Sequence, residues 1–148
     1  MSSACPGCGL TLPESDGPTH PYIGASAACW ELYGRLLAGT YGQPDAQLAV
    51  DAYAAQHPGE PGRRQAQSVA LHLATLCTVL ECGGDPQAGP ARYARMAEQG
   101  PYEWLEPPAT LGAVTVADVL AGTSARAWAE SVWAAWTPHH AAVRALLA

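Results

Sequence analysis

Residues 65–82, QAQSVALHLATLCTVLEC, form the most apolar stretch of the chain and predict its central helix. Val69, Leu73 and Leu76 recur at three- and four-residue steps, as on one face of an α-helix. Polar side chains occupy only a narrow stripe, which consists of Gln65, Ser68, His72 and Thr75. Such a helix buries most of its surface, and Gly83-Gly84 ends it. The stretch therefore predicts a helical protein built around residues 65–82.

The same periodicity predicts shorter helices on both sides of this one. Ser26 can cap the first of them, and Asp118 lies at the third position after a helix start at Thr115. Residues 100–114 hold three prolines and predict an extended arm that packs aromatic side chains on the helices. We expect an all-α fold, an irregular bundle of five to six helices. The expected helices are 26–40, 44–57, 65–82, 90–99, one that begins at Thr115, and a last one from Thr123 that Thr137-Pro138 interrupts.

Length and charge limit the organisation and the partners. A chain of 148 residues fits one domain, and folding should bury roughly 68–70% of its surface, enough for a core without disulfides. A net charge of −6 argues against binding nucleic acid or an anionic membrane. The chain shows neither a secretory signal nor an apolar run of membrane-spanning length. We expect a cytoplasmic, single-domain protein (1–148). The sequence does not decide whether it forms a homo-oligomer.

The first 25 residues contain the most specific motif, Cys5-Pro6-Gly7-Cys8-Gly9. Two thiolates at this spacing bind one tetrahedral zinc ion, and the glycines let the backbone fold tightly around the sulfurs. The alternative is a redox C-x-x-C, which usually lies between a strand and a helix; neither element is expected here. Residues 1–25 are rich in Gly, Pro and Ser and lack a helical period, so we expect a metal to order them.

A closed zinc site needs two more ligands, and His20 and Cys29 are the nearest candidates in the sequence. Cys29 would lie in the first helical turn, where the helix dipole favours a thiolate. The alternatives are a buried free thiol for Cys29 and a loop histidine bonded to the backbone for His20. The predicted site is CCHC-type, and Cys77 and Cys82 are expected to be separate thiols of the central helix. Its ligands would be Cys5, Cys8, His20 and Cys29.

Four further histidines lie in the helical part, where they are candidates for acid–base catalysis or for a second metal site. Asp51 and Glu81 could add carboxylates, but no HExxH, HxxxH or ExxH pair places two ligands on one helix. The alternative is that His57 caps the end of its helix and the others are satisfied at interfaces. The candidate catalytic residues are His57, His72, His139 and His140.

Several segments together resemble a family of small bacterial proteins classed as a domain of unknown function. The resemblance spans nearly the whole chain and is most specific in CPGCG (5–9) and VDAYAAQHPG (50–59). It implies a single domain with a metal-binding N-terminal segment and names no reaction. The other matching segments are GPTHPY (17–22), SAACW (26–30), QSVALHLATLC (67–77), WLEPP (104–108), TVADVL (115–120) and WAAWTPHH (133–140).

The sequence leaves three functions open. The first is a binding protein, with a structural zinc and a helical surface for a protein or small-molecule partner, to which the tryptophans and the prolines around Trp104 would contribute apolar contact area. The second is an enzyme with a histidine-lined cleft between helices. The third makes the cysteine site catalytic, with three protein ligands and one water.

Overall fold

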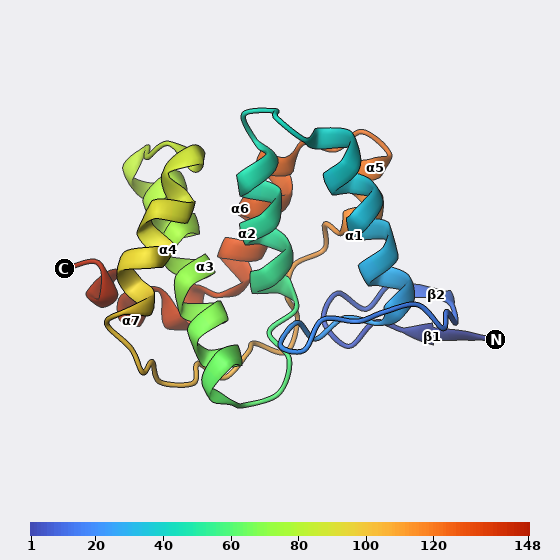
Figure 1. Ribbon diagram of the computed structural model, residues 1–148, viewed down its shortest axis with the longest axis horizontal. Helices are drawn as coiled ribbons and strands as arrows, with labels where there is room; N and C mark the ends of the chain where they lie inside the picture. Colours follow the sequence, from blue (N-terminus) through green and yellow to red (C-terminus); the bar gives the residue numbers. More distant parts are fainter.

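The central helix expected over 65–82 is α3, Arg63–Cys82, in the computed structural model, which describes residues 1–148. The fold is all-α, as predicted, and α3 packs against four other helices (Figure 1). Gly83 ends α3 in the left-handed conformation (φ 67°) that glycine adopts without strain. The four partners of α3 are α2 (Ala46–Gln56), α4 (Gly89–Ala97), α6 (Ala125–Ala135) and α7 (His140–Leu146).

Two of the remaining helices, α1 and α5, begin where the sequence predicts. Helix α1, Ala27–Thr40, starts after Ser26, whose Oγ accepts a hydrogen bond from the Cys29 amide at 3.2 Å. Helix α5, Val116–Leu120, begins with the expected capping box between Thr115 and Asp118, and it packs on α1. Single 3₁₀ turns precede α4 and α7, at Pro86–Ala88 (η1) and Thr137–His139 (η2).

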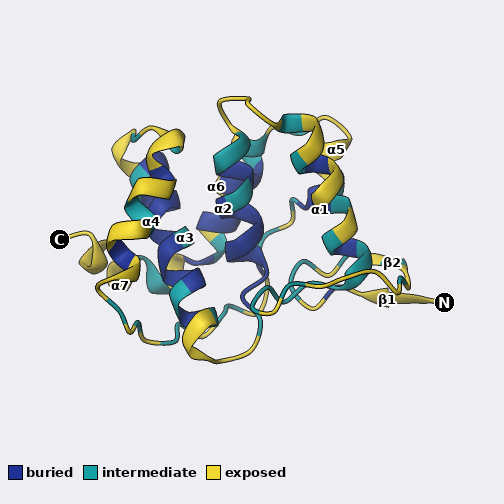
Figure 2. Ribbon diagram, in the orientation of Figure 1, coloured by how far each residue is buried: buried dark blue, intermediate teal, exposed yellow.

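Helix α2 lies in the middle of the core and packs against both α3 and α6, and Figure 2 shows most of it as buried. Every residue from Asp51 to Gln56 is buried, so α2 is enclosed on nearly all sides. Trp128 and Trp136 are fully buried, and their indole N–H groups donate to Gln56 Oε1 and to the Ala55 carbonyl, both at 3.0 Å. Pairing these donors offsets the cost of desolvating them. The hydrogen bonds of Trp128 and Trp136 thus connect α6 to the end of α2.

Residues 1–26 form no helix, but they contain a small β-hairpin that the sequence did not predict. Strands β1 (Ser2–Ala4) and β2 (Thr11–Pro13) are antiparallel, with Ser2 opposite Pro13 and Ala4 opposite Thr11. Both strands are largely exposed, and Leu12 of β2 is the one strand residue that packs on the core, so these three-residue strands leave no alternating pattern in the sequence. Among the helices, none combines the length and apolar character that a membrane crossing requires.

Candidate metal centre

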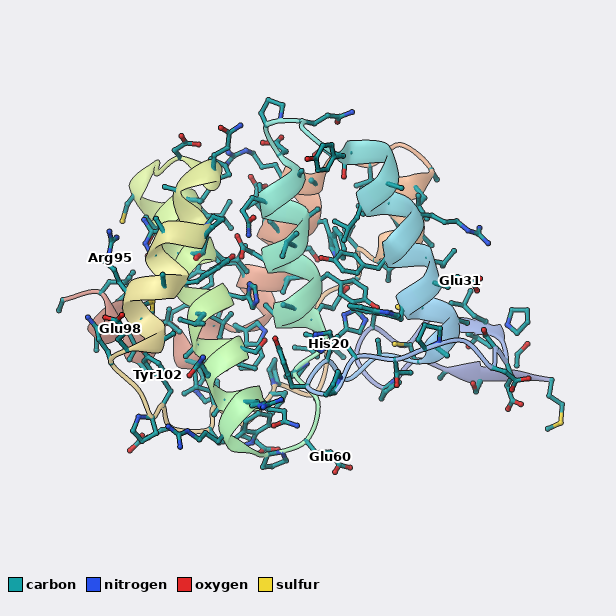
Figure 3. All side chains as sticks on the ribbon, in the orientation of Figure 1. His20, Glu31, Glu60, Arg95, Glu98 and Tyr102 are labelled. Atoms are coloured by element: carbon teal, nitrogen blue, oxygen red, sulfur yellow. The ribbon has the colours of Figure 1, made fainter.

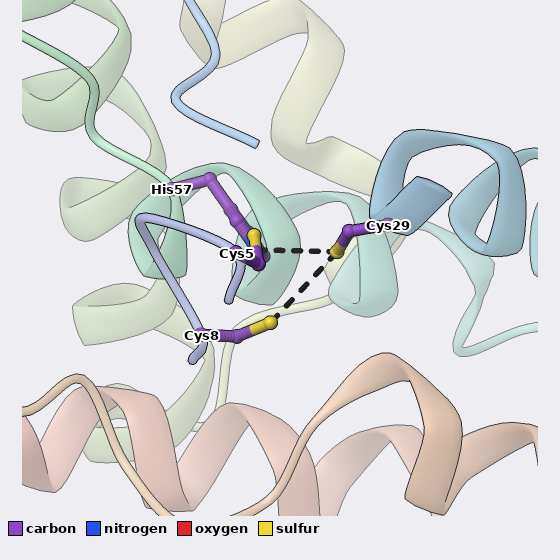
Figure 4. Close-up of side chains that lie close together, drawn as sticks. All are labelled: Cys5, Cys8, Cys29 and His57. Atoms are coloured by element: carbon purple, nitrogen blue, oxygen red, sulfur yellow. Dashed lines mark hydrogen bonds between the residues drawn. The ribbon is translucent and has the colours of Figure 1, made fainter. Parts of the chain in front are cut away.

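Three cysteines and one histidine meet where the N-terminal hairpin touches α1 and α2. The sulfurs of Cys5, Cys8 and Cys29 and a ring nitrogen of His57 all lie within 4.8 Å of one another. Figure 4 shows the four side chains converging, with dashed lines from the Cys29 sulfur. Cys5, Cys29 and His57 are buried and Cys8 is half-buried, so the cluster lies at the edge of the core.

The hairpin turn presents Cys5 and Cys8 on one side. The Cys5 amide donates to the Leu10 carbonyl at 2.8 Å, and the Gly9 amide donates to the Cys5 carbonyl at 2.9 Å. Between the cysteines, Gly7 lies against the end of α2: a Cβ there would come within 2.5 Å of the His57 ring and 2.6 Å of the Gln56 carbonyl. Gly7 is therefore needed because a side chain would push the hairpin away from His57.

Cys29 reaches the cluster from the first turn of α1. Its sulfur lies 3.8 Å from Cys8 Sγ and 3.2 Å from the Tyr53 hydroxyl, and the Ser26 amide donates to Cys5 Sγ at 3.5 Å. The Tyr53 hydroxyl and the Ser26 amide can donate to sulfurs, and the N-terminal end of α1 is positive. These features stabilise thiolates, which are the form of cysteine that binds metals.

His57 is held in one orientation at the C-terminal end of α2. Its Nδ1 lies 2.7 Å from the Tyr53 carbonyl, the acceptor one helical turn earlier, so Nδ1 carries the proton and donates. The ring also stacks on Tyr53 with centroids 4.0 Å apart. In the neutral ring Nε2 is then the unprotonated nitrogen, and it lies 3.5 Å from Cys29 Sγ. A backbone carbonyl that orients a ligating histidine in this way is common around protein-bound metals.

Contacts within the cluster shift the pKa values of Cys5, Cys29 and His57. Hydrogen bonds with Cys29 and Cys8 lower the pKa of Cys5 far below its ordinary value. Hydrogen bonds with Cys5 and Cys8, together with burial, raise the pKa of Cys29. Burial by itself would lower the pKa of His57, but its hydrogen bonds with Cys5 and Cys8 raise it to about 9. The cluster thus combines thiolate charge with a protonated His57 ring at neutral pH, and a metal cation can take the place of the ring proton.

The fourth member of the cluster is His57, where the sequence predicted His20. His20 lies in the loop before α1 (Figure 3), where its Nδ1 accepts from the Tyr22 amide at 3.3 Å and its ring packs on Trp30. It therefore adopts the alternative role of a loop histidine bonded to the backbone. The hairpin folds back onto the end of α2, which brings in a histidine far away in the sequence. Cys77 and Cys82 lie outside the cluster on α3.

The four helical histidines do not converge on one cleft. His57 joins the cysteines, and it also has its predicted role as the residue that ends α2. His72 Nδ1 donates to Asp51 Oδ1 at 2.8 Å between α3 and α2. His139 Nε2 lies 2.7 Å from the Glu106 carbonyl, and His140 Nε2 lies 2.7 Å from the Trp133 carbonyl. The last two histidines are thus occupied by backbone carbonyls.

One comparison with known proteins identifies the chain. A family model described as a family of unknown function, DUF5946, matches residues 3–137. The chain belongs to this family. The matched residues include all four members of the cluster, so the candidate metal centre lies entirely within the DUF5946 region. Searches of the curated proteins and of the solved structures found no match.

A signal for His57 was present in this DUF5946 sequence. His57 follows Tyr53 by one helical turn on the apolar face of α2, and it is 0% exposed. A histidine buried at the end of a helix needs partners for both ring nitrogens. One partner is the Tyr53 carbonyl, and the other has to come from another segment. The cysteine sulfurs supply the partner of the second ring nitrogen, Nε2.

Proposed function

We propose that this DUF5946 protein is a cytoplasmic zinc-binding protein. In this proposal Cys5, Cys8, Cys29 and His57 hold one structural zinc ion, and the helical surface binds a protein or small-molecule partner. Zinc is the divalent ion that most commonly takes tetrahedral sets of three cysteines and one histidine. Such a site carries a net charge of −1, which the amide and hydroxyl groups around the sulfurs stabilise.

The spacing of the ligand atoms carries the proposal. Zinc binds sulfur at about 2.3 Å and imidazole nitrogen at about 2.0–2.1 Å, so tetrahedral angles require about 3.8 Å between two sulfurs and about 3.5 Å between sulfur and nitrogen. Cys8 Sγ and Cys29 Sγ are 3.8 Å apart, and Cys29 Sγ and His57 Nε2 are 3.5 Å apart. These two separations match those of one zinc ion, and all four ligand atoms lie within 4.8 Å of one another.

Four protein ligands favour a structural role over a catalytic one. A catalytic zinc usually has three protein ligands and one position for water or substrate. Here His57 takes the fourth position, and three of the four side chains are buried. Zinc would supply a cross-link among the hairpin, the start of α1 and the end of α2. It would add to the few apolar contacts that residues 1–26 make with the core.

The partner-binding role is supported by the arm between α4 and α5. Trp104 is half-buried in this arm, and with Pro101 and Tyr102 it lines a hollow beside the start of α3. Partly exposed aromatic side chains beside prolines are typical of protein contact sites. The cytoplasmic location is supported by five free cysteines, because a reducing compartment preserves thiols.

Metal analysis of the purified protein tests the zinc proposal. We expect one zinc per chain by mass spectrometry, and cobalt substitution should give the absorption of a tetrahedral thiolate site. His57→Gln and Cys8→Ser should each lower the zinc content or weaken zinc binding markedly. His20→Gln and Cys82→Ser are the matched controls, because they change the same residue types outside the cluster.

Two results would contradict the proposal. One is a purified wild-type protein that neither contains zinc nor takes it up. The other is a protein in which His20→Gln removes zinc while His57→Gln retains it, which would restore the ligand set expected from spacing alone.

A further inference from the structure

A pocket outside the metal centre lies over the polar stripe of α3. Its volume is about 410 Å³, and its lining includes Arg64, Ser68 and His72, which follow one another at four-residue steps along one face of the helix. Tyr22 lines it from the loop before α1, and Tyr93 lines it from α4. Pockets for small molecules commonly measure about 300–1,000 Å³. The polar stripe of the central helix therefore lines a cavity of ligand size.

His72 is fixed in this pocket by a buried hydrogen-bond network. Its Nδ1 donates to Asp51 Oδ1 at 2.8 Å, and the Tyr93 hydroxyl donates to the same oxygen. Gln47 Nε2 in turn donates to the Tyr93 hydroxyl at 2.7 Å. Asp51 is 0% exposed and His72 is 15% exposed, so the carboxylate lies behind the ring. In the neutral ring this network leaves Nε2 of His72, a residue that lines the pocket, as an acceptor.

Two buried polar atoms beside this network have no partner in the protein. Ser68 Oγ is one of them, in a residue that is only 6% exposed and lines the pocket. The other is the second carboxylate oxygen of Asp51. Buried polar groups without a partner are rare in folded proteins, because each costs about 1–3 kcal/mol. The pocket therefore offers the Ser68 hydroxyl and His72 Nε2 as unused hydrogen-bonding groups.

The entrance of the pocket attracts an anion. Arg64 lies in the first turn of α3, next to Arg63, and this turn contains no acidic residue. Neither arginine forms an ion pair, although the chain has 13 acidic and only 7 basic residues. Cations at the positive end of a 20-residue helix are unfavourable, and a bound anion would reverse that effect.

Next to the pocket is a smaller aromatic cavity. It has a volume of about 150 Å³ and shares Tyr22 and His72 with the pocket. Trp30, Tyr33 and Tyr53 line it, and the last two rings are stacked 3.9 Å apart. An aromatic lining favours a flat, apolar ligand body. The site thus combines a cation, a fixed histidine and aromatic side chains, of which Tyr22 and Tyr93 belong to the pocket itself.

We propose that this pocket binds a small aromatic carboxylic acid that carries a hydroxyl group. Arg64 contacts the carboxylate, and His72 Nε2 accepts a hydrogen bond from the hydroxyl. Ser68 adds a hydrogen bond to the ligand, and Asp51 is a positioning residue that fixes the tautomer of His72. The pocket of Arg64, Ser68 and His72 contains no member of the cysteine cluster, although Tyr53 of the neighbouring cavity lies 3.2 Å from Cys29 Sγ, and the proposal does not depend on zinc.

Calorimetric titration with three matched probes tests this proposal. 4-Hydroxybenzoate has both functional groups, 4-hydroxybenzamide lacks the charge, and benzoate lacks the hydroxyl. We expect 4-hydroxybenzoate to bind at least about tenfold more tightly than each of the others, the value of one charge-assisted or one directed hydrogen bond.

Single substitutions test which residue causes each difference in affinity among the three probes. Arg64→Gln should weaken the binding of 4-hydroxybenzoate by about tenfold and abolish the preference of the pocket for 4-hydroxybenzoate over 4-hydroxybenzamide. Arg63→Gln is the control, because the adjacent arginine lines a different hollow. His72→Gln should abolish the preference over benzoate. Arg64 is exposed, so its variant keeps the test valid even where His72→Gln folds poorly.

The positioning role of Asp51 has its own readout. In the wild type, nitrogen NMR should show His72 protonated at Nδ1 with a free Nε2, and Asp51→Asn should change this to a mixture of tautomers. No detectable binding of 4-hydroxybenzoate at millimolar concentration, equal binding of the three probes, or equal effects of Arg63→Gln and Arg64→Gln would each overturn the proposal. Zinc content measured on the same samples separates this outcome from failure of the metal site.

Discussion

The two ends of the chain lie at opposite ends of the molecule (Figure 1). Different kinds of side chain connect them to the core. At the N-terminal end, residues 1–26 bury few large side chains, and Cys5 and Cys8 connect them to Cys29 and His57. At the C-terminal end, α7 packs on α3 through Val143, which is 0% exposed. His140 stacks on Trp133 with ring centroids 3.8 Å apart.

The difference follows from what each segment can bury. Helix α7 has an apolar position to place against α3, and the hydrophobic effect holds it there. The N-terminal segment is rich in Gly, Pro and Ser, so apolar burial cannot repay the entropy that its ordering costs. Ligand bonds to one ion can supply that free energy from four side chains. The four predictions below test this contrast between the ends.

The largest effect should come from Cys29, which belongs to both the cluster and α1. Cys29→Ser is expected to lose zinc and to lower the free energy of unfolding by about 3–5 kcal/mol, because the remaining buried charges lose their partner. The melting temperature should fall by about 10 °C or more. Cys82→Ser, at an exposed position of α3, should change neither quantity measurably. A Cys29→Ser protein with full zinc and unchanged stability would show that the cluster does not hold the N-terminal end.

Chelation should affect the two ends unequally. Removing zinc with a strong chelator is expected to raise amide hydrogen exchange in residues 1–26, at the start of α1 and at the end of α2, the segments that the cluster joins. Exchange in α3, α6 and α7 should change little, because these helices rest on apolar packing. Circular dichroism should keep most of its helical signal. Loss of the whole helical signal would mean that the metal holds the core as well.

At the C-terminal end, Val143→Ala should have a smaller effect that is independent of zinc. Removing two buried methyl groups is expected to cost about 2 kcal/mol, measured by denaturant unfolding of the zinc-loaded protein. The zinc content should stay at the wild-type value. Ala141→Ser, on the exposed side of α7, is the control. If Val143→Ala released zinc, the two ends would be coupled rather than separately fastened.

The smallest effect should come from the ion pair that joins α7 to the end of α3. Arg144 donates to both carboxylate oxygens of Glu81, at 2.6 and 2.9 Å, and these hydrogen bonds lower the pKa of Glu81 to about 2. A depressed carboxyl pKa stabilises the fold above the ordinary value of 4.5, and this stabilisation is lost as the pH falls through about 2. Because the pair is solvent-accessible, Glu81→Gln should cost less than about 1 kcal/mol at neutral pH.

The same variant should become indistinguishable from wild type at low pH. Urea unfolding at neutral pH and near pH 2 measures the difference directly. A cost for Glu81→Gln that grew as the pH fell would contradict the role of the ion pair at this end.

Local signals in the sequence predicted much of the helical part. Ser26, the capping box at Thr115 and the turn at Gly83 act within a few residues of themselves, so their effects are legible without the tertiary structure. The apolar face of residues 65–82 likewise identified the central helix. The short strands were missed because each has three residues and only Leu12 packs on the core, which is too little to give a period in the sequence.

The sequence by itself determined most of the helices and three members of the cluster, because cysteine spacing and helical periodicity are local properties. Only the tertiary structure decided that His57 joins them and that His20 does not. It also placed Asp51 and Tyr93 around His72 in a pocket. The physical reason is that a ligand set or a hydrogen-bond network forms among side chains that are close in space. That closeness arises in two ways. Helix α2 packs against α3 and α6, and the hairpin can approach the end of α2 because Gly7 has no side chain.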